Sequence, residues 1–360
     1  MFPIICFSQK KKTAFISYFV PISKDVKKKY YVSNRNVDYY KYCSRIADNK
    51  YSLTNNSSIL NSDSKKILFN NIFNKAKNGE LVVYQYNDGL DFYGPAPEGN
   101  WIGEKKISNK NEIKQAISYE KSRDSIDNEG FTFYDDNGDN IFIYFLDECK
   151  IDDFIGIKFY EEWTFDYKNL TIDKKILYYA PAIKAINPVT LELVGLRCPF
   201  IVENKNLKTK QIIATDFYTN TDIFCNRETN DSWFKDNLEP SVKFPFIKEA
   251  MTNENNSFYE CSPPYNKKIS NIEALSTEVF IDSIVVDDEG YEKPLYDKNG
   301  DVIQIKYLEY YLQEKINSLG FIENWFFDDR TSSFSKDVSG ISLEVLNYEG
   351  ESEPIFLLKK

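Results

Sequence analysis

The chain has 360 residues, of which 42% are hydrophobic and 16% aromatic, which is enough apolar material for one or two packed cores. Its formal net charge of −10 excludes a broad basic surface for binding nucleic acid. There is no histidine, which excludes a Ser-His-Asp or Cys-His catalytic arrangement and removes the most common general base and metal ligand.

Cysteine usage predicts no metal site. The six cysteines are scattered, and none forms a Cys-x-x-Cys pair. A zinc site would have to gather four of them without a histidine, so we expect no metal and no cofactor. Disulfides are compatible with export, but the spacing specifies none. The cysteines are Cys6, Cys43, Cys149, Cys198, Cys225 and Cys261.

The first 29 residues are interpreted as a separate N-terminal segment. Met1–Gln9 is largely apolar and is followed by Lys10–Lys12. It reads either as a short buried strand or as the end of a truncated export signal, and we favour the export signal. The lysine runs at 10–12 and 27–29 are interpreted as solvated. No apolar run in the chain reaches the roughly 20 residues that span a bilayer.

A helix is predicted from Ser62 to the Asn78-Gly79 stop signal. Residues 30–62 before it show no clean period and are read as an irregular lead-in. Glu80–Tyr86 follows as a strand, and residues 94–99 are a Pro- and Gly-rich loop. The apolar residues that give the helix its three- and four-residue spacing are Ile67, Leu68, Ile72, Phe73 and Ala76.

From residue 105 onward the sequence repeats itself at a shift of 162 positions. Lys105–Asn109 recurs letter for letter as Lys267–Asn271, and Tyr134–Asp139 matches Tyr296–Asp301. Self-similarity at a fixed spacing is the signature of a duplicated structural unit. We therefore predict two copies of one unit, each with a helix, a hairpin and a Trp-centred strand.

The Trp-centred strand is the clearest part of the repeat. Gly156–Asp166 has apolar side chains at alternate positions, as in a strand with one buried face, but Glu161 falls on that face. Gly320–Asp328 repeats the pattern with Glu323 in the same place. The candidate residues for structural core or partner contact are Phe159, Glu161, Trp163, Phe165, Asp166, Phe321, Glu323, Trp325, Phe327 and Asp328.

Asp135–Asp139 resembles the start of a calcium-binding loop. An EF-hand loop would need a glutamate at its twelfth position and a helix on each side, but Leu146 occupies that position and the flanks alternate as strands. Asn-Gly between two strands is a strong hairpin signal, with positive φ expected at both residues. We predict a hairpin.

The paired carboxylates have a functional and a structural interpretation. Glu161 with Asp166, and Glu323 with Asp328, could supply the two carboxylates of a glycoside hydrolase. However, five residues along one strand place two side chains on opposite faces. A buried ion pair or a hydrogen bond to Arg, Lys or Tyr, or a bulge that turns the side chain outward, is the structural interpretation, and we favour it.

The two tryptophans of these strands have a similar pair of interpretations. Trp163 and Trp325 could stack on sugars or bases. At strand spacing among Phe and Ile, they are expected to be core. The sequence has no Gly-rich phosphate loop, no G-x-S-x-G and no H-E-x-x-H motif, so we find no catalytic signature.

Several stretches resemble the GldN/PorN family. Ile157–Lys168 resembles that family's "Y-x-I-K-E-x-W-F/Y-F-D-K" signature, and Glu323–Asp328 is close to it again. The "G-I" that the family has before Ala-Pro is Tyr178-Tyr179 here, and histidines often found around these motifs are missing. The other similar stretches are residues 64–84, Ile176–Pro181, Asp216–Asn220 and Ile247–Asn255.

This resemblance implies a periplasmic, non-enzymatic component of the type IX secretion and gliding apparatus of Bacteroidota. Members of the family form rings with a partner lipoprotein at the outer membrane. We therefore expect an envelope scaffold with an envelope protein partner, compatible with homo-oligomers, without nucleic acid and without a membrane span. The alternatives are a secreted or periplasmic carbohydrate-binding or lytic protein, and a secreted protein that shares only the module.

The expected fold class is α+β and strand-rich, made of two related units. The first GldN-like unit is assigned to residues 30–240. The second, partial unit is assigned to residues 241–360, with the boundary near residue 240.

Overall fold

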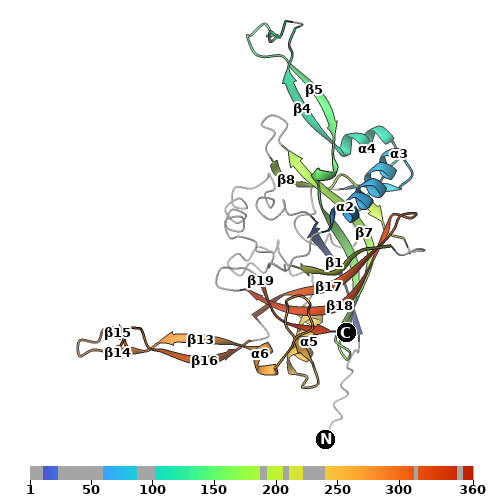
Figure 1. Cartoon of the computed structure of the whole chain (residues 1–360). Coiled ribbons are helices and arrows are strands. Elements are labelled where there is room, and N and C mark those ends of the chain that lie inside the picture. The colour runs from blue at the N-terminus through green and yellow to red at the C-terminus, as the bar shows by residue number, and fades with distance from the viewer. Residues whose placement is uncertain are drawn as a thin grey trace.

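Strands dominate the structure, and short helices accompany them (Figure 1). The expected strand-rich α+β class is confirmed. None of the described helices is long and apolar enough to cross a membrane. The computed structural model describes residues 11–22, 60–86, 102–127, 129–186, 193–205, 211–221, 240–311, 315–346 and 352–359. The predicted loop at 94–99 and nearly all of the lead-in at 30–62 lie outside these residues.

The first sheet is built around the strand that contains Trp163. Its strands follow the order β1-β6-β7-β9-β2-β3, and β8 pairs with β7. The described pairs in this sheet are antiparallel. The strands are β1 (Lys11–Pro21), β2 (Val83–Tyr86), β3 (Ile102–Ile107), β6 (Phe154–Asp166), β7 (Thr171–Ile186), β8 (Leu193–Arg197) and β9 (Ile201–Glu203).

The second sheet is built in the same way around the strand that contains Trp325. Its order is β10-β17-β18-β19-β11-β12, so an edge strand, the Trp strand and the strand after it stand in the same sequence in both sheets. The strands are β10 (Gln211–Thr221), β11 (Phe258–Tyr259), β12 (Lys268–Ile269), β17 (Ile316–Asp328), β18 (Ser333–Leu346) and β19 (Ser352–Lys359).

Two edge strands differ from the sequence-based expectation. β1 is a regular strand paired with β6 over its whole length, so Lys11 and Lys12 begin a strand and do not lie in a tail, although the Lys11 side chain is exposed to solvent as expected. β10 pairs with β17, although a boundary near residue 240 would assign it to the first unit. The pattern of β1 was not recognised because Thr13–Val20 mixes polar and apolar residues without clean alternation.

The helices lie between the strands along the chain. The predicted helix is confirmed, and Gly79 ends it in a left-handed conformation with φ 77°, which glycine adopts without strain. A π-helical turn interrupts it, which the periodicity does not reveal. The segments are α2 (Ser62–Phe69), η2 (Asn70–Asn74), α3 (Lys75–Asn78), α4 (Lys110–Ala116), η3 (Ile151–Asp153), α5 (Pro240–Thr252) and α6 (Asn271–Leu275).

Two long β-ribbons project away from the sheets in different directions (Figure 1). We call them arm 1, residues 118–148, and arm 2, residues 276–310. Arm 1 contains β4 (Ser118–Asp124) paired with β5 (Phe142–Glu148). Arm 2 contains β13 (Ser276–Asp282) paired with β16 (Gln304–Tyr310), and β14 (Ile284–Val286) paired with β15 (Glu292–Pro294).

The predicted hairpin turn at Asp135–Asp139 is confirmed and is not an EF-hand loop. The Asp135 carboxylate accepts hydrogen bonds from the backbone N–H groups of Asn137 and Asp139. Gly138 has φ 85°, whereas Asn137 has a negative φ, so the turn differs from the expected pair of positive φ angles. It is a type I turn followed by a left-handed glycine.

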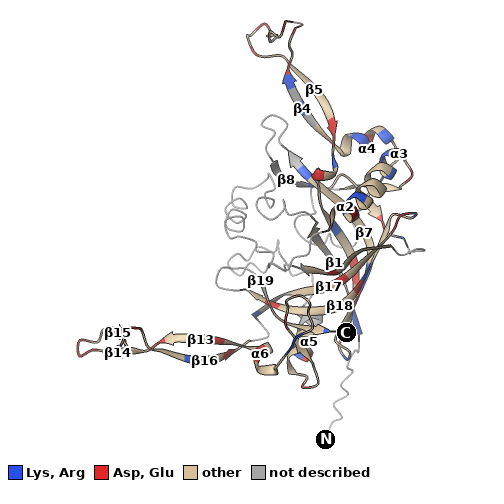
Figure 2. Ribbon diagram, viewed as in Figure 1, with Lys and Arg blue, Asp and Glu red and all other residues tan. Residues whose placement is uncertain are grey.

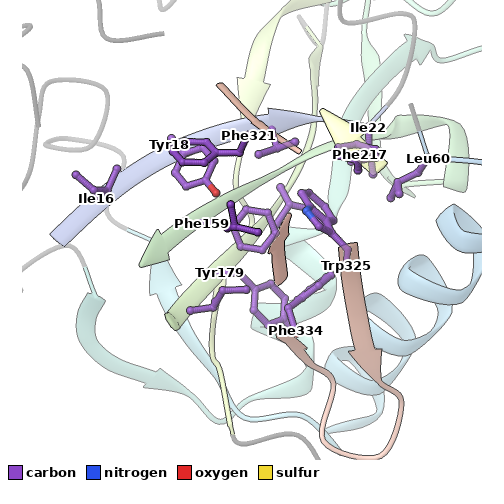
Figure 3. Close-up of a cluster of buried hydrophobic side chains, with 14 of the residues drawn as sticks. Ile16, Tyr18, Ile22, Leu60, Phe159, Tyr179, Phe217, Phe321, Trp325 and Phe334 are labelled. Atoms are coloured by element: carbon purple, nitrogen blue, oxygen red, sulfur yellow. The ribbon is translucent and has the colours of Figure 1, made fainter. Parts of the chain in front are cut away.

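The inner faces of the two sheets share one hydrophobic core. Phe159 of the first sheet meets Trp325 of the second with ring centroids 5.2 Å apart. Phe321 of the second sheet meets Trp163 of the first at 4.9 Å. Figure 3 shows Phe159 lying between Tyr18 and Trp325. Both contacts are edge-to-face, the favoured geometry for aromatic pairs.

Candidate functional site

Glu161 lies completely buried among aromatic rings at the centre of the first Trp strand. Its Oε2 accepts hydrogen bonds from the Trp163 indole N–H at 2.7 Å and from the Tyr18 hydroxyl at 3.0 Å. Its Oε1 accepts one from the Lys336 ammonium at 2.7 Å. A buried carboxylate is tolerated when it is paired and hydrogen-bonded, and Glu161 meets both conditions.

Glu323 repeats this arrangement in the second sheet. Its Oε2 accepts a hydrogen bond from the Trp325 indole at 2.7 Å, the same length as in the first copy. Its Oε1 accepts one from the Lys174 ammonium at 2.5 Å. Both side chains of this ion pair are 0% exposed. The two glutamates therefore have the same kinds of partner.

The two ion pairs cross between the sheets in opposite directions. Glu161 is in the first sheet and its lysine, Lys336, is on β18 of the second, whereas Glu323 is in the second sheet and Lys174 is on β7 of the first. The two lysines are separated by 162 positions, as are the two glutamates. The pairing is thus reciprocal, as in an isologous interface between two like subunits.

Aromatic rings complete the surroundings of each ammonium group. Lys336 Nζ lies 3.4 Å from the centroid of the Phe159 ring, and Lys174 Nζ lies 3.2 Å from that of Phe321. Cations are attracted to the faces of aromatic rings, most strongly where water is excluded. The rings therefore offset part of the cost of burying each charge.

The charges of the second ion pair follow from its surroundings. Burial lowers the pKa of Lys174 to about 8, against the opposing effect of Glu323 and Glu161. Burial alone would raise the pKa of Glu323, but the ammonium groups of Lys174 and Lys336 outweigh it and hold that pKa below its usual value. Both members of the pair are therefore charged at pH 7.

The aspartates at the ends of the Trp strands have a different role. Asp166 Oδ1 accepts hydrogen bonds from the backbone N–H groups of Lys168 and Asn169, both at 3.1 Å. Asp328 Oδ1 accepts one from Arg330 N–H at 2.9 Å. Each aspartate fixes the turn that leads into the next strand.

The structure buries all ten candidate residues. The glutamates face the interface between the sheets and have a lysine as partner, as the structural interpretation expected. The register of each Trp strand shifts beside its glutamate, but the glutamate still points inward. Sequence reasoning missed Tyr18, Lys174 and Lys336. The 162-residue spacing of the two lysines was an available signal for two of them.

The charged side chains of this network are shielded from solvent, so none of them can meet a substrate that arrives from solution. Glu161, Glu323 and both lysines are 9% exposed or less. The Cys149 thiol, on another part of the chain, is also unsuited to nucleophilic attack, because burial raises its pKa to about 12 and only a thiolate reacts efficiently. No group of three His, Cys, Asp or Glu residues in the described ranges could hold a metal ion.

The arms contrast with the core because they expose large apolar side chains. Ile126 is 58% exposed and Phe131 67% on arm 1, and Ile305 is 61% exposed on arm 2. Every described residue of β16 is exposed. A two-stranded ribbon is marginally stable by itself, and contiguous exposed apolar surface marks an interaction site. The arms therefore have the composition of an interface.

The two arm tips are built by the same backbone hydrogen bonds. In arm 1, Ser125 N–H donates to the Ile141 carbonyl at 2.7 Å, and Ile141 N–H donates to the Phe133 carbonyl at 2.9 Å. In arm 2, Ser283 N–H donates to the Ile303 carbonyl at 2.7 Å, and Ile303 N–H donates to that of Leu295 at 2.8 Å. The two tips therefore have the same local backbone structure.

The arm tips are also acidic (Figure 2). Residues 125–141 contain five Asp or Glu residues and no Lys or Arg. Residues 283–303 contain six acidic residues against two lysines. The tips thus combine exposed aromatic rings with negative charge. A complementary surface would be apolar at its centre and basic at its rim.

The comparisons with known proteins give no assignment. No protein-family model matches the chain, and a search of curated proteins finds no match either.

Proposed function

We propose that this protein is a non-enzymatic scaffold or assembly subunit of the cell envelope, which binds a partner protein through its two arms. The observation that carries the proposal is the pair of projecting β-ribbons with exposed apolar side chains and acidic tips. A ribbon of this kind gains stability by covering its apolar face with a partner.

The duplicated glutamates support a structural role over a lytic one. A glycosidase needs two carboxylates that face one substrate-sized space. Glu161 is held by Trp163, Tyr18 and Lys336 inside the core, and Asp166 holds a turn. Trp163 is buried, and its ring centroid lies 5.8 Å from that of Tyr18. Its ring face is therefore not accessible for stacking on a sugar. The carbohydrate-binding alternative gains no support from these residues.

The scaffold is proposed to consist of two related units, each with one sheet and one arm. The same strand order, the reciprocal ion pairs and the matching arm tips support this organisation. The pairing of β10 with β17 favours a boundary between β9 and β10, at residues 206–210, in place of one near residue 240. The second unit then has its own edge strand and is not partial.

The resemblance to the GldN/PorN family suggests what kind of protein the partner is. An envelope lipoprotein of the secretion and gliding machinery is the proposed partner, and the protein is proposed to be exported to the periplasm. The acidic, aromatic arm tips would be met by an apolar surface with a basic rim on that partner. Repetition of the arm in one chain would give two binding elements per subunit, as a ring or lattice requires.

The test is an affinity capture of the tagged protein from its own cell envelope, with and without substitutions in arm 2. The arm 2 variant carries Ile303→Thr and Ile305→Thr, because threonine keeps the β-branched shape that favours a strand and removes apolar surface. The control is Ile212→Thr on β10, where the side chain is 58% exposed but lies on a sheet edge.

The proposal predicts that the control captures the same envelope partner as the unsubstituted protein and that the arm variant loses it. Circular dichroism must show the same fold for both variants. Equal capture by the arm 2 variant and the control would contradict a role for arm 2. A pure monomer without any envelope partner in all samples would contradict the scaffold itself.

A further inference from the structure

The buried interface between the sheets has the symmetry of a dimer contact. Phe159 meets Trp325 while Phe321 meets Trp163, and each glutamate is paired with the lysine of the opposite sheet. In an isologous contact, residue i of one unit touches residue j of the other and the reverse is also true. These reciprocal contacts relate the two Trp strands by an approximate twofold axis that passes between them.

Tyr18 lies close to that axis. Its ring centroid is 4.8 Å from Lys336 Nζ and 5.3 Å from Lys174 Nζ, nearly the same distance from two lysines that the axis relates. Its hydroxyl accepts a hydrogen bond from Lys336 at 2.7 Å and donates one to Glu161 at 3.0 Å. Tyr18 thus fills the centre of the interface and joins one of the two ion pairs.

The corresponding position in the second unit carries a small residue. Tyr18 is opposite Phe159 in the β1–β6 register, and Thr219 is opposite Phe321 in the β10–β17 register. Thr219 is 4% exposed, and its hydroxyl has no hydrogen-bond partner among the described residues. A second tyrosine ring at this position would meet the first near the axis, because the axis carries each position onto the other.

We infer that the interface holds a single aromatic ring at its axis, and that the unlike pair Tyr18 and Thr219 makes the first unit selective for the second unit over a second copy of itself. This inference rests on the two-unit organisation proposed above. The partner that the surface fits is therefore the other half of the same chain. Large and small side chains that must face each other specify unlike pairing by excluding the like pair.

The first experiment exchanges the two side chains in the full chain. Tyr18→Thr, Thr219→Tyr and the double variant are compared by the denaturant midpoint of unfolding. Tyr18→Thr removes an aromatic ring, and Thr219→Tyr adds a second one, so each single variant lowers the midpoint. The double variant places a single ring at the axis, now from position 219 of the second unit, where Glu323 and Lys174 are its expected partners. Its denaturant midpoint is expected to recover at least half of the sum of the two single-variant losses.

Additive losses in the double variant would overturn the inference, because the two positions would then be independent. The arms are unchanged in all three variants, so capture of an envelope partner tests the proposed function separately. A chain that binds its partner but shows additive losses refutes the axis and leaves the scaffold in place.

A second measurement keeps every side chain of the network and covers the case in which Tyr18→Thr does not fold. A protease site is inserted at residues 206–210, and the cut chain is denatured, refolded as the complete mixture of both fragments and weighed by native mass spectrometry. Pairs of unlike fragments are expected. Pairs of like fragments, or fragments that stay single, would overturn the inference.

Discussion

Glu161 remains in an apolar core because three donors surround its carboxylate. Lys336, Trp163 and Tyr18 all donate to it, so removal of one partner leaves the other charge buried and unpaired. Removal of a single partner from a buried pair costs about 3–5 kcal/mol, whereas replacement of both by apolar groups is often close to neutral.

The first prediction is therefore a strong coupling between Glu161 and Lys336. Glu161→Gln and Lys336→Met should each lower the free energy of unfolding by about 3–5 kcal/mol, and the double variant should lose less than the sum. Urea unfolding measures all three. Glu162→Gln, on the same strand and partly exposed, is the matched control and should change stability little. Additive losses would contradict the coupling.

The second prediction concerns acid. The folded pKa of Glu323 is held below its unfolded value of 4.5, so its ionisation contributes stability that is fully present above pH 4.5 and is lost as pH falls through the folded pKa. Glu323→Gln cannot lose this contribution. The stability difference between the unsubstituted protein and the variant should narrow below pH 4.5. A difference that is independent of pH, measured by urea unfolding at each pH, would refute this account.

The third prediction compares two glycines of the second sheet. A Cβ at Gly320 would overlap the hydroxyl groups of Tyr218 and Ser342 and the carboxylate of Glu344. A Cβ at Gly340 would come closest to the end of the Leu357 side chain, at 2.9 Å, and would lie 3.4 Å from the Leu358 carbonyl oxygen; the leucine chain end can shift. Gly320→Ala should therefore lower the melting temperature clearly more than Gly340→Ala. Equal melting temperatures would count against the packing described here.

At the residue scale, the sequence predicted the inward position of the glutamates but not their partners. Alternation places Glu161 on the buried face whatever the partner is. Each lysine lies in the sheet opposite its glutamate, and an ion pair between side chains 175 positions apart cannot be read from periodicity. Tyr18 was missed because Thr13–Val20 lacks clean alternation and was included in the N-terminal segment at 1–29.

At the scale of elements, the arms show what local sequence can and cannot specify. The hairpin turns were predictable because Asp-x-Asn-Gly stabilises a tight turn through its own backbone hydrogen bonds. That the ribbons stand away from the sheets was not predictable, because alternation in an exposed ribbon looks the same as in a packed strand. Phe133 and Phe145, for example, are both exposed.

The fourth prediction is that an arm tip can be removed without loss of the fold. Ser125 and Ile141 are joined directly by a hydrogen bond of 2.7 Å, so an Asn-Gly turn can replace residues 126–140 and close the ribbon. The same replacement fits residues 284–302 between Ser283 and Ile303. Because the tips bury little surface, the melting temperature should stay within a few degrees of the original in calorimetry.

A large drop in melting temperature after this replacement would show that the tips stabilise the body. They would then be part of the fold and not elements for a partner. Replacing one tip at a time provides the internal control, since the two tips share one hydrogen-bond pattern and should behave alike.

At the scale of the whole molecule, two sheets of the same strand order enclose one core and hold two arms outward (Figure 1). The repeat in the sequence predicts two related units, and the boundary proposed for them between β9 and β10 rests on strand register and not on sequence similarity. β10 takes the place of β1 through its register with the Trp strand, and the two strands share few identical residues. The correspondence between β10 and β1 is therefore visible in the strand pairing and not in the sequence.

The most direct test of the scaffold is the mass of the material captured from the cell envelope. The tagged protein and the variant without both arm tips are purified in parallel from the same envelope and measured by light scattering. A large, regular assembly with an envelope partner is expected for the complete protein, and a folded monomer for the variant. A monomer without a partner in both samples would contradict it.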